Sequence, residues 1–253
     1  MQSDIEQEAR RILEAAERKG IVLRLLGGLA VKLSSPSASH RALKRKYPDI
    51  DFAGYSKQGR AIKELFSELG YEPNKRFNAL HGDKRLMFFD NENDRQVDIF
   101  LDIFEMCHKF DFRDRLTISK NILPLADLLV TKLQIVEINE KDVRDIFCII
   151  KDHNLGSESR ETVPDIIDVN YIAGLCSRSW GLYKTLTTNL NKLMRFIDDY
   201  EFEPAEKELI LERLRKLLGF IEKAPKSTKW KMRAAVGEKV RWYELPEEAI
   251  RTT

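Results

Sequence analysis

The sequence predicts an α+β protein in which a mixed β-sheet with flanking helices is followed by a C-terminal helical bundle. Short runs of β-branched and aromatic residues alternate with helical patterns up to Ile103. From Pro124 onward, apolar residues instead recur at helical spacing. With 253 residues, 43% of them hydrophobic, the chain can form one large domain or two smaller ones. We expect two domains, over residues 1–155 and 156–253.

The chain opens with a helix, a strand and a double glycine. Asp4–Lys19 places its apolar residues on one helical face, and Gly20 ends the helix. Ile21–Leu26 is typical of a strand, and it leads through Gly27 and Gly28 into a short helix. Glycines let a backbone approach a phosphate closely, and the free N–H groups at the start of a helix attract anions. An ordinary tight turn is the alternative.

Two strand-like runs carry acidic side chains. Asp49 and Asp51 alternate with apolar residues, so their carboxylates share one face of a strand. Asp98 lies in a second run of this kind, Gln96–Asp102. Two carboxylates about 7 Å apart at the backbone can bind one divalent cation, and Asp98 completes a triad if the strands pair. A solvated strand face is the alternative.

A basic loop over residues 34–48 separates the double glycine from the acidic pair. It could contact a phosphate or a nucleic acid over the site, or it could lie in solvent. Its basic residues are Arg41, Lys44, Arg45 and Lys46.

The sheet is completed by later segments. Ser56–Leu69 predicts an amphipathic helix that Gly70 ends. Arg85–Phe89 and Arg95–Ile103 are typical of strands, and the polar residues 90–94 between them predict a turn.

A lysine interrupts the apolar face of the next predicted helix, Leu125–Val136. Lys132 lies in the middle of that face, so it needs an anionic partner or a route to water. A phosphate or the carboxylate triad would satisfy it. In the helix Glu140–Lys151 that follows, we interpret Asp142 and Asp145 as salt-bridge partners rather than catalysts.

The C-terminal part is predicted to be helical. A polar linker at Ser157–Thr162 precedes helices at Pro164–Cys176, Trp180–Tyr200 and Pro204–Ile221. The tail over residues 223–241 mixes basic residues with tryptophan. It could bind a nucleic acid, or it could dock its tryptophans onto the bundle and leave its lysines in water.

Composition excludes several classes of protein. The three cysteines lie far apart, so neither a zinc site nor a disulfide framework is indicated, and the four histidines show no ligand spacing. The longest apolar runs fall short of the ~20 residues that a membrane span needs. The net charge is only +2, and no targeting segment is visible. We therefore expect a cytoplasmic protein without membrane association.

The motifs Leu26-Gly27-Gly28, Asp49-Ile50-Asp51 and Val97-Asp98-Ile99, in this order, resemble the signature of the DNA polymerase β-like nucleotidyltransferase superfamily. The segments 125–133 and 141–146 look like helices of AbiEii-type nucleotidyltransferases from abortive-infection toxin–antitoxin systems. The resemblance spans about residues 21–152. It departs from the family in the 20 residues between Gly28 and Asp49, a longer gap than usual, and in the helical C-terminal part.

The resemblance implies a nucleotidyltransferase fold and a metal-dependent enzyme that moves a nucleoside monophosphate from a nucleoside triphosphate to an acceptor hydroxyl. Asp49, Asp51 and Asp98 would bind Mg²⁺ or Mn²⁺ in a two-metal reaction that releases pyrophosphate. The implied nucleotide-binding residues are Gly27, Gly28 and Lys132.

The acceptor and partners are expected on the same grounds. The basic loop and tail favour an RNA end, with a protein or a small molecule as other acceptors. The AbiEii likeness implies a toxin with a cognate antitoxin. The alternative function is a catalytically inactive protein that binds a nucleic acid or a partner on the same scaffold.

Overall fold

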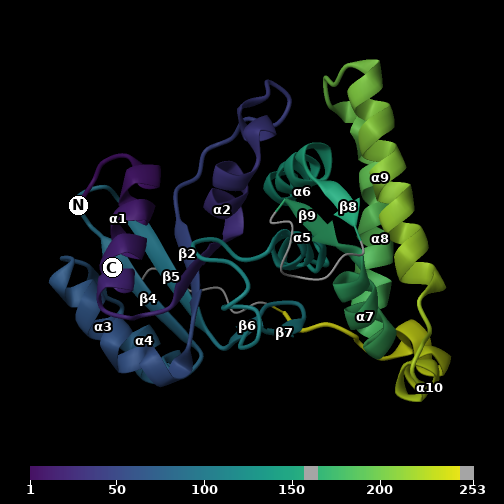
Figure 1. Cartoon of the computed structure of the whole chain (residues 1–253). Helices are drawn as coiled ribbons and strands as arrows, with labels where there is room; N and C mark the ends of the chain where they lie inside the picture. The colour runs from purple at the N-terminus through teal and green to yellow at the C-terminus, as the bar shows by residue number, and fades with distance from the viewer. Residues whose placement is uncertain (157–164, 246–253) are drawn as a thin grey trace.

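The computed structural model describes residues 1–156 and 165–245 and shows a mixed α+β architecture (Figure 1). A sheet with flanking helices is followed by a group of helices, which confirms the predicted fold class. The first part contains α1 (Ile5–Arg18), β1 (Leu23–Leu26), α2 (Gly27–Ser34), β2 (Ile50–Gly54), α3 (Gly59–Glu68), β3 (Glu72–Pro73), α4 (Lys75–His81), β4 (Arg85–Asp90) and β5 (Arg95–Leu101). The later elements are β6 (Ile103–Glu105), β7 (Lys109–Asp111), α5 (Leu125–Leu133), α6 (Glu140–Asp152), β8 (Asn154–Gly156), β9 (Ile166–Asp168), α7 (Val169–Arg178), α8 (Trp180–Phe196), α9 (Pro204–Lys223) and α10 (Thr228–Val236).

The main sheet has five strands in the order β1-β2-β5-β4-β3. Only β2 and β5 run parallel, and their register places Asp51 opposite Asp98. The strands that carry the predicted acidic residues are therefore neighbours, as the triad requires. Because side chains alternate along a strand, both aspartates lie on the face opposite to Phe52 and Ile99.

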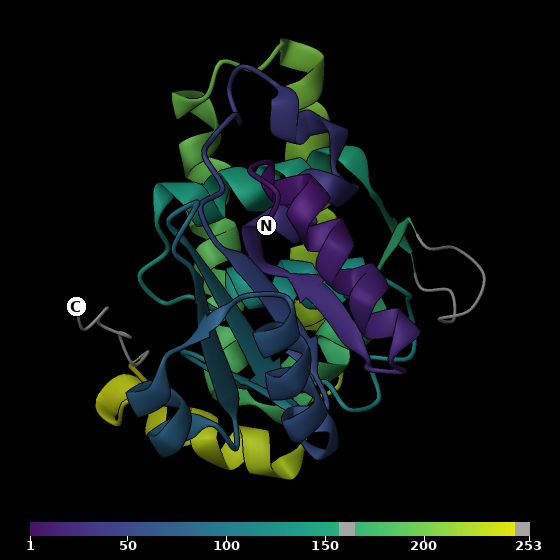
Figure 2. The same ribbon diagram turned by 90° about the vertical axis from the view of Figure 1, so that its left-hand side faces the viewer.

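One face of this sheet is covered by α1 and α3, and Figure 2 shows α1 lying in front of the strands. The helix α1 begins where the Asp4 side chain accepts hydrogen bonds from the backbone N–H groups of Glu6 and Gln7. Its buried residues Ala9 and Ile12 belong to the same hydrophobic core as the sheet residues on that face. This packing orients β2 and β5 so that their acidic side chains face away from α1.

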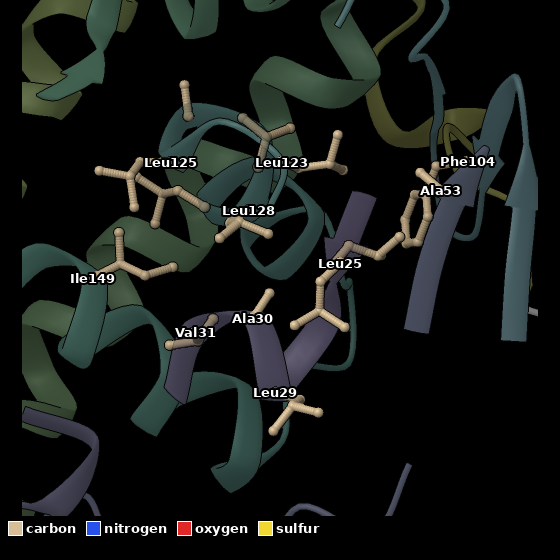
Figure 3. Close-up of a cluster of buried hydrophobic side chains, with 14 of the residues drawn as sticks. Leu25, Leu29, Ala30, Val31, Ala53, Phe104, Leu123, Leu125, Leu128 and Ile149 are labelled. Atoms are coloured by element: carbon tan, nitrogen blue, oxygen red, sulfur yellow. The ribbon is translucent and has the colours of Figure 1, made fainter. Parts of the chain in front are cut away.

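The other side of β1 and β2 is covered by α2, which also packs against α5 and α6. Figure 3 shows the apolar cluster at this junction, where Ala30 and Val31 of α2 lie near Leu128 of α5 and Ile149 of α6. All four side chains are almost fully buried. The start of α2 and the two later helices are thus held together beside the acidic strands.

The C-terminal helices match most of the expected boundaries. The exception is the helix predicted at Pro164–Cys176, because residues 166–168 form the strand β9 beside β8 and the helix α7 begins only at Val169. The Asp168 side chain caps that helix by accepting a hydrogen bond from the Tyr171 N–H. The predicted linker, Ser157–Thr162, lies outside the described residues.

The helical group continues the hydrophobic core instead of standing apart from it. Helix α5 contacts α7 and α8, and α6 contacts α9. The division at residue 155 stays a prediction. Across the described ranges, no helix combines the length and apolar character that a membrane span requires.

The basic tail follows the second of the two alternatives. Helix α10 packs against α7 and α8, and its Trp230 ring meets Tyr183 edge-on at 5.2 Å between centroids. Trp242 donates a hydrogen bond through Nε1 to Thr185 Oγ1 at 3.1 Å. The tryptophans are therefore docked on the helices, and both are half-buried.

Candidate functional site

The site is built on the open face of the sheet, where the parallel strands β2 and β5 lie side by side. Asp51 is half-buried, Asp98 is only 2% exposed, and the two are register partners. Asp49 directly precedes β2 and borders the same hollow as Asp51. The structure thus brings the three predicted carboxylates to one region.

Asp98 has partners that the sequence analysis did not identify. Arg85 donates a hydrogen bond through Nε to Asp98 Oδ1 at 2.9 Å, and Gln96 donates through Nε2 to Oδ2 at 2.6 Å. Arg85 lies on β4, and the antiparallel register places Met87 opposite Asp98, so Arg85 reaches Asp98 diagonally. Both oxygens of Asp98 are therefore already engaged.

Asp51 is placed differently, because the described residues supply no hydrogen bond or ion pair to its carboxylate. Burial and the charge of Asp98, with a smaller effect from Asp49, raise the pKa of Asp51 to about 7, and Lys132 opposes this rise. Desolvation and the charge of Asp98 also raise the pKa of Asp49, whereas Lys141 lowers it. Acidic groups at this point repel one another, and a cation would relieve that repulsion.

Gly27 and Gly28 approach two functional side chains closely. Gly27 has a φ of +71°, and a Cβ atom there would lie 2.1 Å from Asp51 Oδ2. A Cβ atom on Gly28 would lie 2.0 Å from Arg45 Nη2. The chain's own side chains make these close approaches, and the expected contact of the glycines with a phosphate stays a prediction. Helix α2 includes both glycines, because it starts at Gly27, and no side chain caps it.

Lys132 finds its anionic partners on α6. Its Nζ lies 2.9 Å from Asp142 Oδ1 and 2.9 Å from Asp145 Oδ2, and these carboxylates raise its pKa although burial alone would lower it. Asp145 also accepts two hydrogen bonds from Arg45 of the basic loop, at 2.8 and 2.6 Å. Asp142 and Asp145 are thus salt-bridge partners, as expected, and Lys132 borders the site without touching Asp51 as an ion pair.

A small hollow of about 150 Å³ lies at the start of α2, and we call it the basic hollow. The hydroxyl of Tyr47, which also lines it, is buried and makes no hydrogen bond to the described part of the chain. The Arg45 guanidinium covers the Tyr47 ring at 4.1 Å from its centroid. The charged residues around this hollow are Arg45, Lys132 and Lys141 together with Asp49, Asp51 and Asp142.

A larger cavity of about 660 Å³ lies on the other side of Asp51, and we call it the apolar cavity. Asp51 and Lys132 border both spaces, so the two meet at the acidic strand. Phe100, Phe104 and Tyr243 supply much of the apolar wall. No local pattern in the sequence indicates this cavity, because its walls come from segments more than 100 residues apart.

The donor chemistry of the site fits a divalent cation in part. Asp49 and Asp51 offer hard carboxylate oxygens with unneutralised charge, which is the ligand type that Mg²⁺ prefers. Across residues 1–156 and 165–245, however, no three His, Cys, Asp or Glu side chains are grouped so that they could hold a metal ion. Both oxygens of Asp98 are engaged by Arg85 and Gln96 instead.

Comparisons with known proteins give weak similarities. No protein-family model matches the chain, and no curated protein matches it. Among solved structures, the chain is similar to the antibiotic-resistance factor ANT(2'')-Ia, with 14% identity and a TM-score of 0.38 over 56% of this chain and 80% of that one. It is also similar to the lincosamide antibiotic adenylyltransferase LnuA bound to lincomycin, with 16% identity and a TM-score of 0.39 over 55% of this chain and 92% of that one. Because both scores are low, we base the function on this chain's own residues.

Proposed function

We propose that this chain is a metal-dependent nucleotidyltransferase of the DNA polymerase β-like superfamily. The observation that carries this proposal is the position of Asp49 and Asp51 at the basic hollow, beside the uncapped start of α2. Carboxylates without a cationic partner beside Lys141 suit a cation bound to a polyphosphate. The buried Tyr47 hydroxyl in the same hollow offers an unused hydrogen bond to such a ligand.

Different residues at the site would bind the phosphates and the metal ion. The N–H groups at the start of α2 would bind phosphate oxygens, and Lys141 would add positive charge around the same hollow, whereas the charge of Lys132 is shared with Asp142 and Asp145. Asp49 and Asp51 would hold the magnesium ion, which supplies charge neutralisation on the triphosphate. Asp98 stays fixed by Arg85 and Gln96 and lends its negative charge to the floor of the site.

The transfer step needs only the acceptor hydroxyl and the nucleoside triphosphate. The acceptor hydroxyl oxygen forms a bond to the α-phosphorus, and the bond from that phosphorus to the bridging oxygen of the β-phosphate breaks. Pyrophosphate leaves, and the hydroxyl proton is released to water. The transferred group is a nucleoside monophosphate, now esterified to the acceptor.

A second function is favoured by one specific observation. Because both Asp98 oxygens are engaged, a protein that binds nucleotide or a partner without turnover is the alternative. The toxin role with a cognate antitoxin and the RNA end as acceptor remain predictions from the sequence.

Label transfer tests the proposal. Purified protein is incubated with magnesium, each α-phosphate-labelled nucleoside triphosphate in turn, total RNA, cellular protein and a small-molecule extract. We expect label on one acceptor class, and the loss of that label in Asp51→Asn. The matched control is Asp111→Asn, because Asp111 is an exposed strand aspartate paired with Arg113 away from the site. Nucleotide binding without label transfer or pyrophosphate release would support the inactive alternative instead.

A further inference from the structure

We infer that the apolar cavity is the acceptor site, and that the acceptor is a small hydroxyl-bearing molecule with an apolar body that is uncharged or cationic. This inference rests on the proposed nucleotidyl transfer, because it names the substrate class of that same site. The cavity measures about 660 Å³, within the ~300–1,000 Å³ typical of small-molecule pockets. It opens onto Asp51, where the α-phosphorus must lie if the basic hollow holds the triphosphate.

The walls of the cavity are mostly apolar. Phe100 and Phe104 come from the end of β5 and from β6, and their rings lie 4.7 Å apart between centroids. Ile135 and Val136 come from the turn after α5, on the other side of the cavity. An aromatic and aliphatic surface of this kind stabilises an apolar body by burying it, at ~25 cal/mol for each Å² removed from water.

The far wall is formed by the C-terminal segment, which Figure 1 shows running from α10 back toward β6 and β7. Tyr243 and Leu245 of this segment line the cavity, and Leu245 is 62% exposed. The Glu244 N–H donates a hydrogen bond to the Cys107 carbonyl at 3.0 Å, which ties the segment to the turn between β6 and β7. Trp242 anchors it to α8 through Thr185. The wall is thus held at both sides.

The charges around the cavity exclude an anionic acceptor. Both basic side chains in its lining already have carboxylate partners, because Arg85 pairs with Asp98 and Lys132 pairs with Asp142 and Asp145. Apart from Asp51, which the proposed cation would neutralise, one acidic side chain of the lining, Glu137, has no cationic partner among the described residues. The remaining charge is negative, which favours a neutral or cationic molecule and repels phosphates.

These features argue against the RNA end that the sequence favoured. A single-stranded nucleic acid needs basic side chains along its backbone, and here the free charges at the transfer point are acidic. Arg45 of the basic loop is bound by Asp145, and Trp230 and Trp242 of the tail are packed on other side chains. The basic residues that suggested RNA therefore lie away from the cavity or are already paired.

Occupancy of the cavity can be tested with a neutral apolar dye, N-phenyl-1-naphthylamine, whose fluorescence rises in apolar surroundings. The full-length protein should bind it, and Val136→Trp, which fills the cavity, should weaken binding at least about tenfold. Val236→Trp is the matched control, because Val236 is 42% exposed on α10 and does not line the cavity. Leu245→Ser, at a position that is 62% exposed, should weaken binding about threefold.

The charge preference can be tested with two alcohols of the same size and opposite charge. Phenylalaninol is cationic and phenyllactate is anionic, and each carries one ring and one hydroxyl. We expect phenylalaninol to displace the dye at a concentration at least about fivefold lower than phenyllactate. Glu137→Gln should narrow this difference, and the exposed position of Glu137 keeps the fold intact. Equal displacement by the two compounds would overturn the charge assignment.

The possible results distinguish a failure of the acceptor-site assignment from a failure of the proposed transfer reaction. Dye binding that depends on Val136, without label transfer to any alcohol, would show a small-molecule site but would contradict the transferase and, with it, the acceptor role of the cavity. Label transfer to an oligoadenylate that is unchanged in Val136→Trp supports the transferase and overturns the acceptor site. Displacement of the dye by magnesium-ATP would show that the cavity holds the nucleotide base, and would also overturn it.

Discussion

Glu8 on α1 and Asp51 on β2 are two carboxylates on opposite faces of the same sheet, and their pKa values shift in opposite directions. Glu8 is fully buried and accepts hydrogen bonds from Arg11, from the Tyr71 hydroxyl and from the Gln2 N–H. Burial alone would raise the pKa of Glu8, but these donors lower it to about 2. Asp51 has no such donors within the described chain, and burial with the neighbouring Asp98 raises its pKa to about 7.

The difference shows where this protein stabilises charge and where it leaves charge unsatisfied. A buried carboxylate with several donors contributes to folding, whereas one that faces like charges opposes it. Unfavourable arrangements of this kind cluster at functional sites, and the proposed cation with its polyphosphate would satisfy this one. The Glu8 cluster is thus structural, and the Asp51 cluster is the candidate site.

Exchanging Asp51 for Asn should produce the largest effect. We expect turnover to fall at least about a thousandfold, which corresponds to about 4 kcal/mol of transition-state stabilisation. Stability without magnesium should stay the same or rise, because the change removes repulsion from Asp98 and Asp49. Pyrophosphate release and urea unfolding measure the two quantities. A variant that unfolds more easily than the wild type would place Asp51 among the structural carboxylates.

Exchanging Glu8 for Gln should lower the stability of the fold and leave turnover unchanged. The lowered pKa of Glu8, against an ordinary value of 4.5, corresponds to about 3 kcal/mol of stability at pH 7. Because the folded pKa lies below the unfolded one, this contribution is complete above pH 4.5 and disappears as the pH falls toward 2. Urea unfolding at pH 7 and at pH 3 should therefore show a large loss of stability in the variant at pH 7 and a smaller one at pH 3. Turnover of the folded variant should match the wild type, and an equal loss at both pH values would contradict this account.

The acidic strands could be predicted from the sequence because their signal is local. Alternation along a strand places Asp49 and Asp51 on one face, whatever the rest of the chain does. The contact of Arg85 with Asp98 was not predicted, because it depends on the register of the β4–β5 hairpin. The turn at residues 91–94 sets that register. Asp142 and Asp145 were recognised as salt-bridge partners, but not as the partners of Lys132.

Other features had no local signal at all. Helix α4 was missed because none of its residues is buried, so it lacks the apolar periodicity that identifies a helix. The apolar cavity combines Phe104 with Tyr243, which lie far apart in the sequence. Only the path of the C-terminal segment across the turn between β6 and β7 brings them together.

Gly27 offers a finer test of how Asp51 is placed. Alanine at this position must adopt a φ of +71° and must also fit a Cβ atom 2.1 Å from Asp51 Oδ2. Gly20→Ala is the matched control, since Gly20 has a φ of +68° with nothing within 4 Å of its Cβ position. Gly20→Ala should lose about 1 kcal/mol from backbone strain alone, and Gly27→Ala about 2 kcal/mol together with a measurable loss of turnover. Equal unfolding free energies and unchanged turnover in both variants would show that the approach of Asp51 to Gly27 does not matter.

Magnesium should give the smallest effect, and it separates the two carboxylates without any assay of turnover. A cation that binds at Asp51 stabilises the folded state by about 1.4 kcal/mol at ten times its Kd, which raises Tm by about 3–6 °C in a protein of this size. The wild type and Glu8→Gln should both show this rise in a thermal melt, because Glu8 is occupied by Arg11 and Tyr71 on the opposite face of the sheet. In Asp51→Asn the rise should disappear. A rise of the same size in Asp51→Asn would mean that the cation binds elsewhere, and the raised pKa of Asp51 would then reflect the repulsion from Asp98 without a metal to relieve it.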